Sequence, residues 1–141
     1  MLSPYLLAIA TAWIVAQASK LLIDSVRNQG SINFRQLYVS GNMPSGHSAA
    51  TVALMTIIGL NNGVGDESFA IATLIAAIVM YDAMMVRRST GEQGVAIQAL
   101  IKEQKSKVSL PRAAKGHEPL EVVAGAFVGL AVGLIVFFLT Q

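Results

Sequence analysis

Apolar residues gather in four long stretches along the 141-residue chain, and polar residues separate them. Pro4 and Pro119 stand at the start of the first and last stretches, where a helix loses nothing by the missing proline N–H. A backbone in lipid must satisfy its own polar groups, so apolar stretches of about 20 residues predict membrane-spanning helices. The four predicted spans cover residues 4–23, 46–60, 69–86 and 119–139.

This pattern predicts an all-α integral membrane bundle of about four transmembrane helices, folded as a single domain over residues 1–141. The composition agrees, because 54% of residues are hydrophobic and only 13% are charged, whereas soluble domains carry about 25%. A soluble bundle of buried helices is the alternative, and the charge-free run from Val122 onward argues against it. The chain has no cysteine, which excludes a disulfide framework and a thiolate metal site.

The charges predict how the bundle is oriented in the membrane. All ten Lys and Arg residues fall in or beside two of the three loops, whereas the loop at 61–68 carries Asp66 and Glu67 and no base. The positive-inside rule then places both basic loops in the cytoplasm and both termini outside. The net charge of +2 gives no reason to expect a nucleic-acid partner.

Two segments have alternative interpretations. Residues 16–18 resemble a signal-peptide cleavage site, but no Lys or Arg precedes the apolar run, so we expect the first stretch to remain as a span. Residues 92–115 form a polar segment that is either a loop or, because Ile97, Leu100 and Ile101 follow helical spacing, partly an interfacial helix.

Three polar motifs flank the predicted spans, and each alone has an ordinary structural explanation. Lys20 and Arg27 lie two helical turns apart and suit a solvated helix end. The run Pro44-Ser45-Gly46-His47 suits a helix start, whose free N–H groups also bind anions. His117 and Glu121 are spaced as an i,i+4 pair, in which the carboxylate would fix one ring nitrogen and leave the other free to react.

The predicted topology places all of these motifs at the cytoplasmic ends of the spans. Two histidines, several cations and a helix-start anion site are the groups that phosphoryl transfer requires. The residues concerned are Lys20, Arg27, Ser45, His47, Arg87, Arg88, His117 and Glu121.

Together the motifs resemble those of the type-2 phosphatidic acid phosphatase superfamily, which includes vanadium-dependent haloperoxidases. The run Tyr81-Asp82-Ala83-Met84-Met85-Val86-Arg87-Arg88 and the segment around His117 are similar to its small divergent bacterial and plastid branch. The chain departs from the usual motifs at Asn28, where Pro is typical, at Pro111, where Arg is typical, and at Glu121, which replaces Asp. We expect Arg87, Arg88 or Arg112 to substitute for the missing arginine.

The resemblance implies a role for each site residue. His117 would attack phosphorus, Glu121 would hold its ring, and His47 would protonate the leaving oxygen and then activate water. The phosphate would be bound by Lys20, Arg27, Ser45, Gly46 and one of Arg87 and Arg88. The resemblance implies no metal and no other cofactor, and the expected partners are membrane lipids and a lipid phosphate or diphosphate substrate.

Two alternative functions stay open at this point. One is a non-catalytic membrane protein that binds anionic lipid headgroups, which the altered third motif favours. The other is a vanadate-using oxidase, which the superfamily also contains.

Two further features lie within the spans. Asp82 is an intramembrane charge, and Arg87 and Arg88 are off its face in a regular helix, so we expect a partner on another helix, such as Lys20. Gly125, Gly129 and Gly133 form a small-residue stripe on the last span. Such a stripe predicts close helix packing within the chain, or alternatively a homodimer seam.

Overall fold

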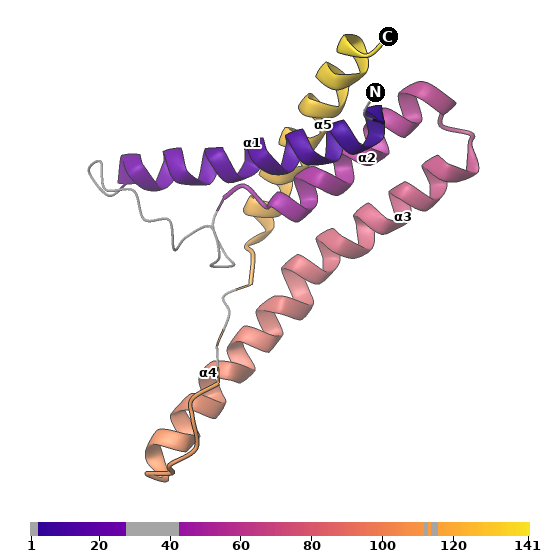
Figure 1. Ribbon diagram of the computed structural model, residues 1–141. Helices are drawn as coiled ribbons and strands as arrows, with labels where there is room; N and C mark the ends of the chain where they lie inside the picture. The colour runs from indigo at the N-terminus through magenta and orange to yellow at the C-terminus, as the bar shows by residue number, and fades with distance from the viewer. Residues whose placement is uncertain (1–2, 28–42, 112, 114–115) are drawn as a thin grey trace.

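The structure is a computed structural model that describes residues 3–27, 43–111, 113 and 116–141. Within these ranges the chain is helical and contains no strand, which confirms the all-α prediction (Figure 1). The elements are α1 (Pro4–Arg27), α2 (Gly46–Asn62), α3 (Glu67–Tyr81), the π-helix η2 (Asp82–Val86), α4 (Arg87–Glu103) and α5 (Pro119–Leu139).

Helix α2 is the centre of the bundle, because it contacts α1, α3 and α5. The helices approach closely through small residues, which suits a membrane bundle, where packing rather than the hydrophobic effect joins helices. On α1 the buried stripe is Ala8, Ala12 and Ala16, each one helical turn from the next. The rest of this core comes from α2 and α5 and consists of Ala49, Ala53, Ile57, Val132 and Val136.

Both chain termini lie at the same end of the bundle (Figure 1). There the Tyr5 hydroxyl donates to Asn62 Oδ1 at 3.1 Å, and Gln141 Nε2 donates to Asn61 Oδ1 at 3.3 Å. At the opposite end the Ser45 N–H donates to the Glu121 carbonyl at 2.9 Å, which joins the starts of α2 and α5.

In the part of the chain that the structure describes, three helical segments are long and apolar enough to cross a membrane: Pro4–Val26, Glu67–Glu103 and Pro119–Leu139. The second predicted span, α2, has only 17 residues and is enclosed by its neighbours, so little of its surface has to face lipid. The third predicted span does not end at residue 86, because α3, η2 and α4 continue as one rod of 37 residues (Figure 1).

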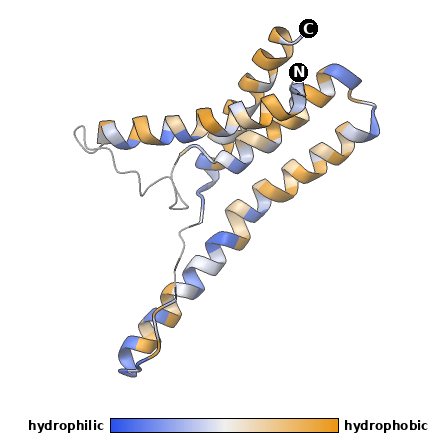
Figure 2. Cartoon of the chain, in the orientation of Figure 1, coloured by the Kyte–Doolittle hydropathy of each residue, from blue (hydrophilic) through white to orange (hydrophobic). Residues whose placement is uncertain are grey.

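The rod also decides between the two interpretations of residues 92–115. Helix α4 reaches Glu103, so the helical interpretation is correct for the first half of this segment. Figure 2 shows apolar residues along α3 and more polar ones toward the end of α4. The sequence signal was weak there because Gly91 and Gly94 are the buried positions of α4, and glycine carries no hydropathy pattern.

Side-chain caps fix where three of the helices begin. Ser45 caps α2, and Asp66 caps α3 by accepting from the Ser68 N–H at 2.8 Å. Hydrogen bonds from the Ser68 hydroxyl and N–H lower the pKa of the Asp66 carboxyl. Pro119 occupies the first turn of α5, and Glu118 and Glu121 form a capping box around it.

The glycine stripe of α5 faces α2 of the same chain. A Cβ on Gly125 would overlap the Ser45 carbonyl oxygen, one on Gly129 would overlap the Ala49 carbonyl oxygen, and one on Gly133 would lie 2.8 Å from Thr56 Cβ. The stripe therefore packs within the chain, as the first interpretation predicted. The face that we considered for a homodimer through Gly125, Gly129 and Gly133 is covered by α2.

This packing predicts that Gly129→Ala destabilises the protein by about 1–3 kcal/mol, because the added methyl group has to push the α2 backbone away. Thermal unfolding in detergent would measure the loss. Ala131→Val, on the exposed side of α5, is the matched control and should unfold near the wild-type temperature. Equal stability of Gly129→Ala and wild type would contradict the close α2–α5 contact.

Candidate active site

A buried histidine and glutamate form the centre of the site at the start of α5. His117 is only 3% exposed, and its Nδ1 lies 2.9 Å from Glu121 Oε2. The same oxygen accepts the Glu118 backbone N–H at 3.1 Å, so the carboxylate is held by the helix start. Among the described residues Nε2 of His117 has no hydrogen-bond partner, so this nitrogen is the one left to react. The predicted pairing of His117 with Glu121 is present.

The backbone just before α5 crosses the rod at the π-helix. The His117 N–H donates to the Ala83 carbonyl at 3.2 Å. A Cβ on Gly116 would overlap the backbone of Arg88, so only glycine fits at this crossing. His117 is thus fixed by three elements: its ring by Glu121 of α5, its N–H by η2 and its preceding residue by α4.

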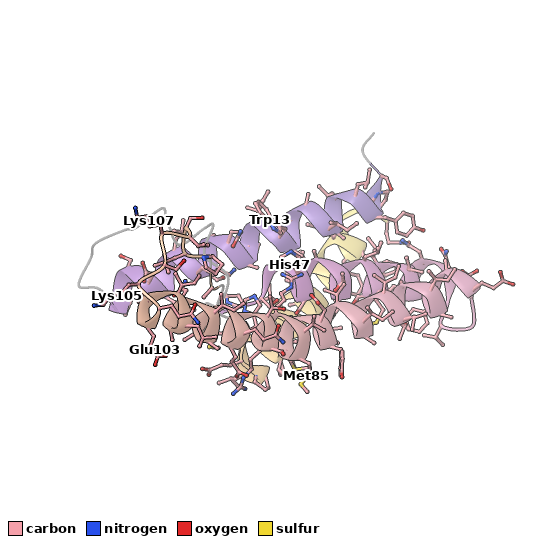
Figure 3. The ribbon with its side chains drawn as sticks, turned by 90° about the horizontal axis from the view of Figure 1, so that it is seen from below. Trp13, His47, Met85, Glu103, Lys105 and Lys107 are labelled. Carbon is pink, nitrogen blue, oxygen red and sulfur yellow. The ribbon has the colours of Figure 1, made fainter. Side chains whose placement is uncertain are left out.

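His47 and two cations approach this pair from other helices. His47 is exposed in the first turn of α2 and lies within electrostatic range of Arg87, His117 and Lys20. Figure 3 shows its ring between α1 and the α3–α4 rod, with Trp13 on the α1 side. The buried Lys20 of α1 is also within electrostatic range of Glu121. The structure therefore brings predicted site residues of α1, α2 and α4 close to His117, which lies just before α5, and to Glu121 within α5.

Ser45 and Gly46, which we predict to bind phosphate, lie where α2 begins. Ser45 is fully buried, and its hydroxyl accepts from the Ser48 hydroxyl at 3.0 Å and from the Ser48 N–H at 3.4 Å. Its side chain therefore serves as a helix cap. Gly46 is buried against Trp13, since an added Cβ would lie 3.5 Å from Trp13 Cδ1.

The predicted phosphate-binding arginines at the end of α1 and the start of α4 differ in how far the structure describes them. Arg27 ends α1, but its side chain lies outside the described residues, as does Arg112. Arg88 pairs with Glu92 at 3.2 Å, and 60% of its side chain is exposed. Arg87 pairs with Asp82 through Nε and Oδ2 at 2.6 Å, and both side chains are about one-third exposed.

The Asp82–Arg87 pair corrects our prediction that Asp82 would find its partner on another helix. In a regular α-helix residues five apart point about 140° away from each other. Asp82–Val86 is instead a π-helix, in which the Arg87 N–H donates to the Asp82 carbonyl five residues earlier. This wider turn brings both side chains to one face. No composition signal marks the π-turn, because residues 83–86 are simply apolar.

A cavity of about 870 Å³ opens beside His117, between α4 and the segment that leads to α5. Its walls combine apolar and charged side chains. They include Arg88, Glu92, Val95, Ala96, His117 and Pro119.

The assembled groups suit phosphoryl transfer. One imidazole is oriented by a carboxylate, a second imidazole stands near it, and Lys20 and Arg87 supply positive charge for phosphate oxygens. Within the described ranges, no group of three or more His, Asp or Glu residues gathers in the manner of a metal site.

Comparison with known proteins defines the class to which this fold and site belong. The family model described as "Divergent PAP2 family" matches residues 2–132, so the chain belongs to the Divergent PAP2 family. The chain is also similar to the uncharacterized membrane protein YuiD of Bacillus subtilis (strain 168). Their alignment is 148 positions long, with 32% identity, and it covers 94% of this chain and 93% of the relative. No solved structure matches the chain.

The double role of Glu121 predicts a graded loss of stability. Glu121→Ala removes the acceptor of both the His117 ring and the Glu118 N–H, so we expect a loss of about 2–3 kcal/mol in unfolding free energy. Glu121→Gln keeps an oxygen at this place and should lose less than half of that. Denaturant unfolding in detergent would measure both, with Val123→Ala on the exposed face of α5 as control. Equal losses in the two Glu121 variants would contradict the assignment.

Proposed function

We propose that this membrane protein is a phosphatase that hydrolyses a lipid phosphate or diphosphate through a phosphohistidine intermediate. The observation that carries the proposal is the buried His117–Glu121 pair with His47, Lys20 and Arg87 around it. Membership of the Divergent PAP2 family supports the same reaction class.

The reaction would proceed in two displacements at phosphorus. In the first, Nε2 of His117 forms a bond to phosphorus while the bond to the leaving oxygen breaks, and His47 gives that oxygen a proton. In the second, His47 takes a proton from water as its oxygen bonds to phosphorus and the phosphorus–nitrogen bond breaks. Glu121 holds the ring and stabilises its positive charge during both steps.

Lys20 and Arg87 would bind the phosphate oxygens in this mechanism. Of the two candidate arginines that the structure describes, Arg87 is the better placed to substitute for the one missing at position 111, because it lies within electrostatic range of His47. Arg88 is engaged by Glu92 on an exposed part of α4. Ser45 and Gly46 contribute by positioning: Ser45 caps α2, and the capped helix start holds His47 beside the other groups.

The location of the site supports a lipid substrate. His117 and Glu121 lie where α5 begins, and α5 is apolar from Val122 to Leu139. An amphiphile whose tail stays in the bilayer would bring its phosphate to this level. The positive-inside charges support a site that faces the cytoplasm.

The phosphatase proposal predicts phosphate release by the purified protein from at least one member of a panel of lipid phosphates and diphosphates. His117→Ala should abolish release, since the nucleophile is gone, and His47→Ala should lower it by about 10²–10⁴. Release should survive EDTA, because the site uses cations of the chain itself. Thermal unfolding of each variant controls for folding.

No release from any lipid by a well-folded wild type would instead favour a protein that only binds anionic headgroups. Flotation with vesicles containing phosphatidic acid would then measure this binding directly. Release that is unchanged in His117→Ala would refute the phosphohistidine route.

The orientation is testable by cysteine labelling, because the native chain has no cysteine. Gly65→Cys lies in the exposed loop between α2 and α3, and Lys107→Cys lies beyond α4 at the site end of the bundle. A membrane-impermeant maleimide added to intact cells should label Gly65→Cys alone, and both variants after lysis. The reverse pattern would place the site outside the cell.

A further inference from the structure

The π-turn Asp82–Val86 touches two parts of the site at once. The side chain of Asp82, its first residue, pairs with Arg87, and the distance from Arg87 Nε to Asp82 Oδ2 is 2.6 Å. Through the Ala83 carbonyl the π-turn accepts the His117 N–H at 3.2 Å. One turn of helix therefore sets where the arginine stands relative to the histidine.

The ion pair leaves most of the arginine available. A guanidinium has five N–H donors, and Asp82 takes only the one on Nε. Within the described part of the chain, the two Nη atoms of Arg87 have no hydrogen bond. Asp82 therefore holds the Nε edge of the guanidinium. The two Nη groups stay available to bind phosphate bidentately.

The pair exists only because of the wide turn. In an α-helix Arg87 would point about 140° away from Asp82. The π-helix brings the two side chains to one face and at the same time offers the Ala83 carbonyl to His117. Gly116 secures this crossing, because a side chain there would overlap the backbone of Arg88.

We propose that Asp82 is a positioning residue, which orients Arg87 toward the phosphate, and that the π-turn fixes this arginine in register with His117. The inference rests on the proposed phosphatase function and deepens it, because it assigns the missing arginine of the third motif to Arg87 and gives it a dedicated partner.

Positioning and simple charge neutralisation predict opposite effects on anion binding. If Asp82 merely neutralised Arg87, Asp82→Asn would remove a negative charge near the site and inorganic phosphate would bind more tightly. If Asp82 orients Arg87, the same variant binds phosphate more weakly, because the Arg87 guanidinium is no longer held toward the phosphate. The sign of the change therefore decides between the two roles.

The test uses the full chain in detergent, with inorganic phosphate as the calorimetric probe and a hydrolysed lipid phosphate as the substrate. We expect Asp82→Asn to raise the Kd for phosphate and the KM about tenfold or more, as small displacements of binding groups do. Arg87→Ala should show a loss at least as large. In the double variant Asp82→Asn/Arg87→Ala, losing Asp82 should add nothing to the loss from Arg87→Ala. Glu103→Gln removes a carboxylate at the far end of the same rod and should behave as wild type.

Unchanged or tighter phosphate binding by Asp82→Asn, or losses that add in the double variant, would overturn the inference while leaving the phosphatase intact. A wild type that neither binds nor releases phosphate would overturn the proposed function and the inference together. If Asp82→Asn does not fold, Asp82→Glu takes its place. It keeps the charge but pushes Arg87 outward, so positioning predicts a raised KM and a purely structural role predicts a wild-type value.

Discussion

The close contact between α2 and α5 is the constraint on which the rest of the structure depends. Their backbones meet because the α5 positions facing α2 are glycines, and the Ser45 N–H bonds the Glu121 carbonyl where both helices start. This contact carries His47 on one helix start to the His117–Glu121 pair on the other. Packing along the length of the two helices thus determines where these site residues lie at the end of the bundle.

The sequence predicted those parts of the molecule that follow from local pattern. Apolar stretches indicated the helices, Ser45 and Pro119 marked two helix starts, and i,i+4 spacing indicated the His117–Glu121 pair. The convergence of Lys20, His47 and His117 followed from topology, because basic residues at one side of the membrane have to share one end of a bundle.

The remaining features depend on tertiary geometry that no local pattern encodes. The π-turn is invisible in an apolar run, so Asp82 was assigned a partner on another helix. The tight α2–α5 contact buries Ser45 completely, which the run Pro44-Ser45-Gly46-His47 alone does not indicate. The pattern of α4 is hard to see in the sequence because its buried positions are Gly91 and Gly94, and glycine carries no hydropathy pattern.

The length of the α3–α4 rod has a consequence for how the protein meets water. At about 1.5 Å per residue its 37 residues measure about 55 Å, while the hydrocarbon core of a bilayer is about 30 Å thick. A helical rod of this length does not fit within the hydrocarbon core, so the polar α4 extends beyond the lipid as a rigid helix. The protein thereby has a rigid extramembrane surface, which the π-turn joins directly to the site.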